Sequence, residues 1–324
     1  MSVRPRSSVR NTSARVTEHD SAAGSGTAAR RPGGRLGGAA DVLAAACLWG
    51  TTGTVRTFVP EASSASIAAV RIVMGGVLLL ALAALTARGT GLRRLLRSRR
   101  NRHLLGVGAV AVAVYQIAFF VAAARTGVAI GTVVTIGSAP AFAGLLGLIT
   151  RQSAFGGRWA LATGGAIAGC AALVAGGQDA GAEPLGIGLA VLSGLSYAVY
   201  ATVASTLIAR GEEGRAVTGA LFGVAAVLLL PVLATGSAGW VLGGTGLLVA
   251  LYLGVVTTAG GYVLFARGLR TTPATTATTL TLAEPAVAAV LGVAVLDERL
   301  GGVALGGLAL LVASLLVLVL PARR

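Results

Sequence analysis

The segment RTGVAIGTVVTIGSAPAFAGLLG, residues 125–147, aligns without a gap to RTTPATTATTLTLAEPAVAAVLG, residues 270–292. A shift of 145 residues superposes the two, and ten residues are identical over the 34 columns that start at Arg125. The identities include the central proline, because Pro140 lies over Pro285. A chain rich in alanine, glycine and leucine matches itself partly by chance. Identical residues at both ends and at the centre of the aligned segments nevertheless indicate an internal repeat.

The composition places this repeat in a membrane. Of the 324 residues, 55% are hydrophobic and only 11% are charged, whereas soluble domains contain about 25% charged residues. A soluble fold of this length would need far more polar surface to cover its core.

Ten segments approach the roughly 20 apolar residues that a membrane-spanning helix requires. They are residues 39–58, 66–87, 104–124, 128–149, 157–176, 185–207, 217–237, 246–266, 273–296 and 302–320. The sequence therefore predicts an all-α integral membrane protein with ten transmembrane helices. Residues 1–38 are rich in arginine and small polar residues and are predicted to form a disordered basic cytoplasmic tail.

The repeat unit contains five of these spans. We expect a first five-helix repeat over residues 39–180 and a second over 181–324. Because five is odd, the second repeat enters the membrane the opposite way up. Inverted repeats are typical of secondary transporters, in which a substrate site near the bilayer midplane is exposed to the two sides in turn.

The arginines predict the orientation. The net charge is +15, and all 26 basic residues are arginine. With the N-terminus inside, 22 arginines lie on the inner side, two lie on the outer side, and Arg56 and Arg71 lie within spans. The positive-inside rule then predicts that both termini are cytoplasmic, in a multi-pass protein of the bacterial plasma (inner) membrane. Arginines spread over every inner connector favour membrane lipid as a partner over nucleic acid.

Several classes of site have no support in the sequence. Without lysine, the chain contains no phosphate-binding loop of an ATPase and no Schiff base with retinal or pyridoxal phosphate. Its two histidines lie in arginine-rich stretches, and both cysteines lie in apolar runs. We therefore expect no metal site and no cofactor. We expect no enzyme either, because an intramembrane transferase or hydrolase needs paired acids with a histidine or a metal.

Several motifs together resemble the drug/metabolite transporter superfamily, EamA type, over about residues 39–321. They are Trp49-Gly50 in the first span, Arg71 early in the second, Pro140 in the fourth, and Glu284-Pro285 and Asp297-Glu298 in the ninth. Many relatives carry a glutamate at the end of the fourth span, where this chain has Arg151-Gln152-Ser153. The resemblance implies export or exchange of a small metabolite, amino acid or drug by secondary transport.

Glu284 is the only acidic residue in the middle of a span. An ionisable side chain there costs about 2.5–3.5 kcal/mol on insertion scales, so it is expected to have a function. Loss of hydration favours the uncharged carboxyl, so Glu284 is a candidate for proton coupling or for binding a cationic group of the substrate. The alternative is a hydrogen-bonded carboxyl that fixes helix packing.

Arg71 lies about five residues inside the second span, roughly 7 Å from its outer end at 1.5 Å per residue. It could bind an anionic group of the substrate or pair with Glu284. Alternatively, it could extend to the outer headgroups or pair with Glu61.

Other polar or aromatic residues lie at mid-span, where the interfacial aromatic belt does not explain them. They are Trp49, Tyr115, Gln116, Ser138, Ser196, Tyr197 and Thr257. Substrate contact and packing between helices remain alternatives for each.

The two aligned prolines are expected to break their helices. Pro285 would free a backbone carbonyl near Thr281, and Pro140 would do the same in the fourth span. Two further motifs, Gly165-x-x-x-Gly169 and Gly302-x-x-x-Gly306, allow close helix packing within the bundle or in a homodimer.

The sequence thus favours a secondary active transporter of a small molecule with possible proton coupling. A channel or facilitator and a non-transporting receptor or assembly protein remain as alternatives.

Overall fold

The computed structural model describes residues 32–150, 156–175, 183–235, 238–297 and 299–320. All regular elements in these ranges are helices. Most of the predicted tail, residues 1–31, lies outside the described part, but residues 32–38 form the start of the first helix. The residues from Pro32 onward cluster as a single unit.

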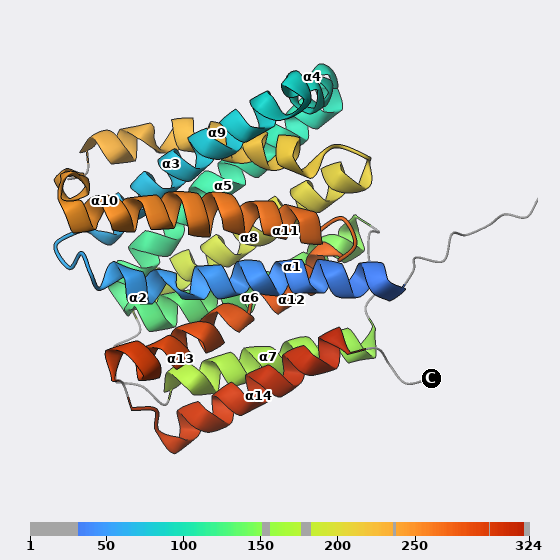
Figure 1. The fold of residues 1–324 in the computed structure, drawn as a ribbon. Coiled ribbons are helices and arrows are strands. Elements are labelled where there is room, and N and C mark those ends of the chain that lie inside the picture. The colour runs from blue at the N-terminus through green and yellow to red at the C-terminus, as the bar shows by residue number, and fades with distance from the viewer. Residues whose placement is uncertain (1–31, 151–155, 176–182, 236–237, 298, 321–324) are drawn as a thin grey trace, which may run out of the picture. The chain divides into compact units, whose positions relative to one another are not determined.

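The helices follow one another along the chain with short connections (Figure 1). The elements are α1 (Pro32–Gly50), α2 (Thr52–Arg56), α3 (Ser64–Leu85), η1 (Thr86–Gly89), α4 (Thr90–Arg97), α5 (Arg99–Thr126), α6 (Val128–Ile149), α7 (Gly157–Ala175), α8 (Pro184–Ala209), α9 (Gly214–Thr235), η2 (Gly239–Leu242), α10 (Gly244–Leu251), η3 (Tyr252–Gly260), α11 (Gly261–Gly268), α12 (Ala274–Leu280), α13 (Ala283–Leu296) and α14 (Gly302–Val319). The element η3 is a π-helix that joins α10 to α11.

Nine helical segments in the described ranges are long and apolar enough to cross a membrane. They coincide with the second to tenth predicted spans, with α10, η3 and α11 forming one segment and α12 and α13 another. The first predicted span, residues 39–58, is also helical as α1 and α2, but it is not among the nine. Its helix contains Asp41 and several glycines and is interrupted at Thr51.

Local sequence signals explain several helix ends. The side chain of Ser63 accepts a hydrogen bond from the backbone N–H of Ser66 and so caps α3. Pro184 is in the first turn of α8, where its missing N–H costs no helical hydrogen bond. Gly127 and Gly211 have φ of +82° and +85° in the tight turns after α5 and α8, a conformation that favours glycine.

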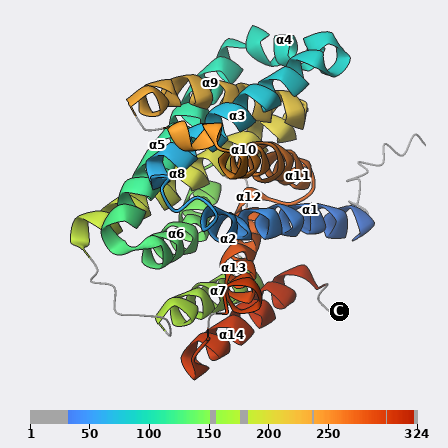
Figure 2. The same cartoon turned by 60° about the vertical axis from the view of Figure 1, so that its left-hand side comes forward.

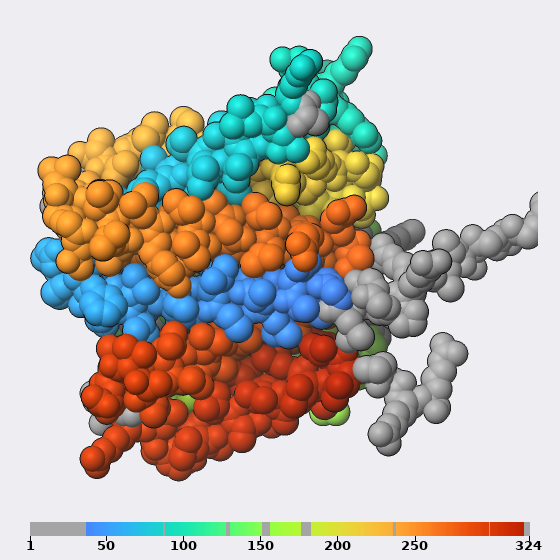
Figure 3. Space-filling view, in the orientation of Figure 1, coloured from blue at the N-terminus to red at the C-terminus, as the bar shows by residue number. Residues whose placement is uncertain are grey.

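The helices pack mainly with partners that are distant in sequence. The most extensive contacts join α3 to α9, α5 to α8, α7 to α14 and α6 to α8, while α1 packs against α11 and α13 (Figures 1 and 2). On one face of the molecule α1 lies between the α10–α11 segment and the α13–α14 segment (Figure 3). The start of α1 and the end of α14 lie on the same side of the bundle (Figure 1).

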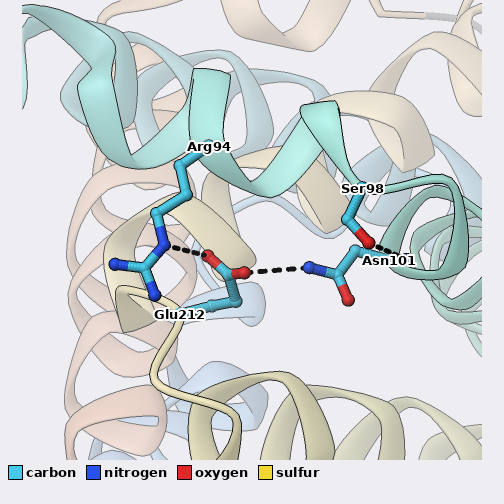
Figure 4. Close-up of polar contacts among 4 residues, drawn as sticks. All are labelled: Arg94, Ser98, Asn101 and Glu212. Carbon is cyan, nitrogen blue, oxygen red and sulfur yellow. Dashed lines mark hydrogen bonds and ion pairs between the residues drawn. The ribbon is translucent and has the colours of Figure 1, made fainter.

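A polar cluster on this side fixes the helix α4, which lies in the predicted connector 88–103 (Figure 4). Glu212, in the turn between α8 and α9, accepts a hydrogen bond of 2.9 Å from Asn101 of α5 and lies 3.7 Å from the Arg94 guanidinium of α4. Ser98 caps the start of α5 by accepting from the backbone N–H of Asn101. The cluster therefore ties α4 and α5 to the α8–α9 turn.

Two glycines allow α7 and α14 to pack backbone against backbone. A Cβ on Gly169 would lie 2.7 Å from the carbonyl oxygen of Gly307, and a Cβ on Gly307 would lie 2.4 Å from the backbone nitrogen of Leu173. The predicted Gly165-x-x-x-Gly169 motif thus packs within the bundle. In contrast, a Cβ on Gly302 or Gly306 would meet no described atom within 4 Å, so the glycine that meets α7 is Gly307.

We predict that Gly307→Leu destabilises the protein and that the adjacent Gly306→Leu does not. The leucine at 307 must displace the backbone of α7, and overpacking of this kind typically costs about 1–3 kcal/mol, whereas Gly306 faces open space. Thermal unfolding of the two purified variants in detergent measures the difference. Equal unfolding midpoints would contradict the packing described for α7 and α14.

Candidate functional site

A cavity of about 160 Å³ lies between helices from both halves of the chain. Only about 10–15 Å³ of such volume is needed to hold one water molecule, so there is room for a small solute. Its walls come from α1, α2, α3, α5 and α6 in the first half and from α8, α11 and α13 in the second, with Thr281 between α12 and α13. Apolar and aromatic side chains predominate, with a few polar groups among them, which is typical of a ligand pocket.

Eight residues predicted from the sequence line this cavity. They are Trp49, Arg71, Tyr115, Gln116, Tyr197, Thr281, Glu284 and Pro285. Residues from several different helices thus meet at one place. This placement makes them candidates for substrate contact, whereas their function remains a prediction.

Three predicted site residues and one proline do not line the cavity. Ser138 donates to the carbonyl of Thr135, and Thr257 donates to the carbonyl of Leu253. Ser196 is buried in α8 without facing the cavity, and Pro140 is buried in α6. These side chains are at the expected depth, but they lie on the packed sides of their helices.

Trp49 is held in the cavity wall by η3. Its indole N–H donates to the carbonyl of Thr257 at 2.9 Å, and its ring contacts Tyr262 with a centroid separation of 4.9 Å. Gly261 lies directly against the indole, because a Cβ there would be 2.6 Å from Nε1. The backbone of η3 and the missing side chain at Gly261 therefore set the position of Trp49.

The π-helical hydrogen bonds of η3 leave room for side chains to bind its backbone. In a π-helix the N–H bonds the carbonyl five residues earlier instead of four. The hydroxyls of Thr257 and Thr258 both donate to the carbonyl of Leu253, at 2.8 and 2.7 Å. Sequence analysis did not predict η3, and the only local signal is the run of two threonines and two glycines over residues 257–261.

Arg71 points into the protein and not toward the membrane surface. The residue is only 9% exposed, and its Nε donates to the hydroxyl of Thr258 at 3.3 Å. Neither predicted ion pair, with Glu284 or with Glu61, is among the ion pairs of the described residues. Arg71 therefore brings a guanidinium to the cavity wall without a carboxylate partner among them.

Glu284 lies in the first turn of α13, where the positive end of the helix dipole stabilises a carboxylate. The chain leaves the helical path between α12 and α13, just before Pro285. The carbonyl of Thr281 is not free as predicted, because it accepts a hydrogen bond of 3.0 Å from the backbone N–H of Glu284. The prediction of a break at Pro140 is wrong, since α6 continues through this residue as one helix.

Two buried polar atoms of cavity residues have no hydrogen-bond partner among the described residues. They are Oγ1 of Thr52 and Nε2 of Gln116. Because an unpaired buried polar group costs free energy, such groups usually have a partner. At a cavity wall they are available to a bound solute.

Aromatic rings form the wall behind the cavity. Tyr197 and Tyr262 line it, and Tyr200 contacts both at centroid separations of 5.9 Å. Phe222 packs on Tyr262 at 4.0 Å and edge-on against Tyr200. Tyr200, Phe222 and Tyr262 are fully buried, so the cavity ends at a layer of packed rings.

Sequence analysis missed several lining residues. They include Thr52, Gly53, Arg56, Phe119, Phe120, Thr132, Thr135 and Tyr262. The sequence placed Arg56 within a span, but it was not predicted to be a site residue. Its position within a span was the available signal.

Comparison with known proteins agrees with this architecture. The model of the EamA-like transporter family matches the chain twice, over residues 37–175 and 184–320. The chain belongs to the EamA-like transporter family. As a member of this family with many apolar helices, it is a multi-pass membrane protein.

Two further proteins are similar to this chain. An uncharacterized transporter of Bacillus subtilis (strain 168), YwfM, is 37% identical over 284 residues, which cover 87% of this chain and 94% of that protein. A solved crystal structure whose description names no function superposes with a TM-score of 0.73 at 19% identity. The superposition covers 89% of this chain and 96% of the chain in that crystal structure. At 19% identity, the similarity supports the fold alone.

We predict that Gly261→Ala displaces Trp49 and that the neighbouring Gly260→Ala does not. The added methyl group would lie 2.6 Å from the indole nitrogen at position 261, whereas at 260 its nearest contact is at 3.5 Å. Quenching of Trp49 fluorescence by acrylamide, obtained as the difference from Trp49→Phe, should increase only in Gly261→Ala. Identical quenching in both variants would show that Gly261 does not position Trp49.

Proposed function

We propose that this chain is a secondary active transporter that exports or exchanges a small metabolite, amino acid or drug by alternating access. The observation that carries the proposal is the cavity, because helices of both family-model matches line it and Glu284 supplies a carboxylate to its wall. A membrane transporter also contacts lipid along its apolar outer surface, and many large apolar side chains of the described helices are exposed.

We further propose that ten helices form two inverted five-helix repeats. Each family-model match contains five predicted spans. Exchanging the two halves also maps the helix contacts onto one another: α5 with α8 corresponds to α11 with α1, and α6 with α8 corresponds to α13 with α1. The pairs α3 with α9, α6 with α12 and α7 with α14 correspond to themselves. Such exchange symmetry is expected when two repeats pack about a common axis.

The cavity extends to one side of the level at which the repeats correspond. Ile136 of α6 and Thr281 are repeat partners, and both line it. The other lining residues of α6 come before Ile136 in the chain, whereas the lining residues of α13 come after Thr281. In an inverted repeat these two directions point to the same side of the membrane. With cytoplasmic termini, this side is extracellular, so we assign the structure to an outward-facing state.

The orientation can be tested by labelling single cysteines in a Cys47→Ser/Cys170→Ser background. Gly53 lines the cavity and a side chain there meets open space, whereas Glu213 is exposed on the predicted cytoplasmic side. A membrane-impermeant maleimide should label Gly53→Cys in intact cells and Glu213→Cys only after permeabilisation. The reverse pattern, or an active alkaline phosphatase fused to the C-terminus, would contradict cytoplasmic termini.

We propose that Glu284 couples transport to protons. A carboxyl group in a largely apolar cavity loses hydration, which favours its uncharged form, so proton binding and release can accompany changes of access. No described residue forms a direct ion pair with Glu284.

We predict that Glu284→Gln reduces proton-coupled flux to the level of empty proteoliposomes while the protein still inserts and folds. Glutamine keeps the size and polarity of the side chain, but its amide group cannot bind and release a proton as a carboxyl group does. Glu61→Gln is the matched control, because Glu61 is exposed and does not line the cavity. Undiminished coupling in Glu284→Gln would exclude this residue from the mechanism.

The transported solute for this assay comes from a screen of metabolites and toxins in cells that overproduce or lack the protein. A carrier should show a flux that depends on pH and saturates with solute concentration. A channel or facilitator should not saturate over the same range of solute concentrations. If Glu284→Gln and wild type give equal flux of every candidate, the non-transporting alternatives are favoured.

A further inference from the structure

We propose that the cavity binds an anionic group of the solute, a carboxylate or a phosphate, at Arg71, and that Thr258 of the π-helix η3 is the residue that positions Arg71. The proposal rests on the transport function proposed above and specifies the chemistry of the transported solute. Thr258 does not line the cavity, so it acts through Arg71.

Arg71 is buried, and most of its guanidinium has no hydrogen-bond acceptor among the described residues. The residue is 9% exposed, and its one hydrogen bond among the described residues uses Nε. Its two terminal NH₂ groups, the forked part of the guanidinium, have no such acceptor, and no carboxylate of the described residues forms an ion pair with them. A buried charge without a partner is costly, and the forked NH₂ groups fit the two oxygens of a carboxylate or phosphate.

The charged residues of the cavity wall favour an anion. Arg56 and Arg71 both line it, and Glu284 is the one acidic residue among the lining residues. Even with Glu284 ionised, the wall carries a net positive charge, which raises the local concentration of anions. An interfacial role would leave Arg71 extended toward the headgroups, but its Nε is bonded to η3.

The hydrogen bonds of Thr258 determine how its hydroxyl meets Arg71. Its hydroxyl has a single proton, which it donates to the carbonyl of Leu253 at 2.7 Å. The hydroxyl oxygen therefore faces Arg71 as an acceptor and orients Nε toward η3. The terminal NH₂ groups are then left for the cavity that Arg71 lines.

Close packing of α3 on η3 makes this contact possible. A Cβ on Gly75, one turn after Arg71, would lie 2.4 Å from the methyl group of Thr258 and 2.9 Å from the carbonyl oxygen of Gly254. The hydroxyl of Thr257 donates to the same Leu253 carbonyl, and Arg71 bonds Thr258 rather than this hydroxyl. Thr257 and Thr258 therefore form a matched pair that differs in the contact at issue.

Trp49 lines the same cavity and can report on anions there without a known substrate. Its fluorescence is measured in a non-ionic detergent, as the difference from the matching Trp49→Phe protein. The quenchers are iodide, an anion, at constant ionic strength made up with chloride, and acrylamide, which is neutral. Positive charge in the cavity wall should increase the quenching of Trp49 by iodide and leave its quenching by acrylamide unchanged.

We expect Arg71→Gln and Thr258→Val each to reduce the iodide quenching of Trp49 about twofold or more, because local anion concentration follows charge. Acrylamide quenching should stay unchanged. Thr258→Ser, which keeps the hydroxyl, and Thr257→Val should behave as wild type. Acetate or inorganic phosphate should protect Trp49 from iodide in wild type and not in Arg71→Gln.

Each arm can overturn a defined part of the proposal. Wild-type iodide quenching in Arg71→Gln, or no protection by either anion, would exclude the anion site. Wild-type iodide quenching in Thr258→Val would exclude the positioning role, and if that variant does not fold, Thr258→Ala is judged by the same criterion. Because quenching requires no flux, these failures are distinct from failure of the proposed transport.

Discussion

A bilayer offers its helices no hydrogen-bond partners, so every backbone group within it must be satisfied inside the protein. This constraint explains why each regular element in the described ranges is a helix, and it also explains where helices are irregular. The π-helix η3 departs from α-helical hydrogen bonding where Trp49 donates to the carbonyl of Thr257 and two threonine hydroxyls donate to that of Leu253. The turn between α12 and α13 occurs where the N–H of Glu284 takes the carbonyl of Thr281. Thr281 lines the cavity, and η3 is bonded to Trp49 and Arg71 of its wall, so both irregular segments lie beside it.

Lipid is as apolar as leucine, so helix association depends on close packing more than on the burial of apolar surface. Small residues determine which helices approach one another. Gly169 and Gly307 join α7 to α14, and Gly75 lets α3 approach η3 closely enough for Arg71 to reach Thr258. Large aromatic rings have the opposite effect around the cavity, where Tyr197, Tyr200 and Tyr262 prevent such approach and close one end. The size of the side chains between helices therefore accounts for both the close helix contacts and the cavity.

Apolar runs in the sequence predicted the spans because length and hydropathy are local properties. Nine of ten predicted spans coincide with candidate membrane helices of the described ranges, and depth along them brought Trp49, Tyr115, Gln116 and Glu284 to one cavity. Depth could not tell which side of a helix faces the cavity, so Ser138, Ser196 and Thr257 were included although they pack elsewhere. The aligned prolines also differ: Pro285 follows a break and Pro140 does not, so a proline alone does not determine where the helix is interrupted. The π-helix η3 depends on contacts from α1 and α3, which no local pattern encodes.

The two family-model matches have corresponding helix contacts, but the side chains proposed to function differ between them. Glu284 aligns with Ala139, and Thr281 aligns with Ile136. A scaffold whose halves can exchange roles supplies two states of similar energy, open to opposite sides. In the exchanged state, the residues after Ile136 in α6 and those before Thr281 in α12 would face the cavity. Ile136 and Thr281 are repeat partners and would line it in both states, with Glu284 one turn beyond this level. Under the proposed alternating access, a carboxylate so close to the level shared by both states stays beside the solute, and a single site serves both sides of the membrane.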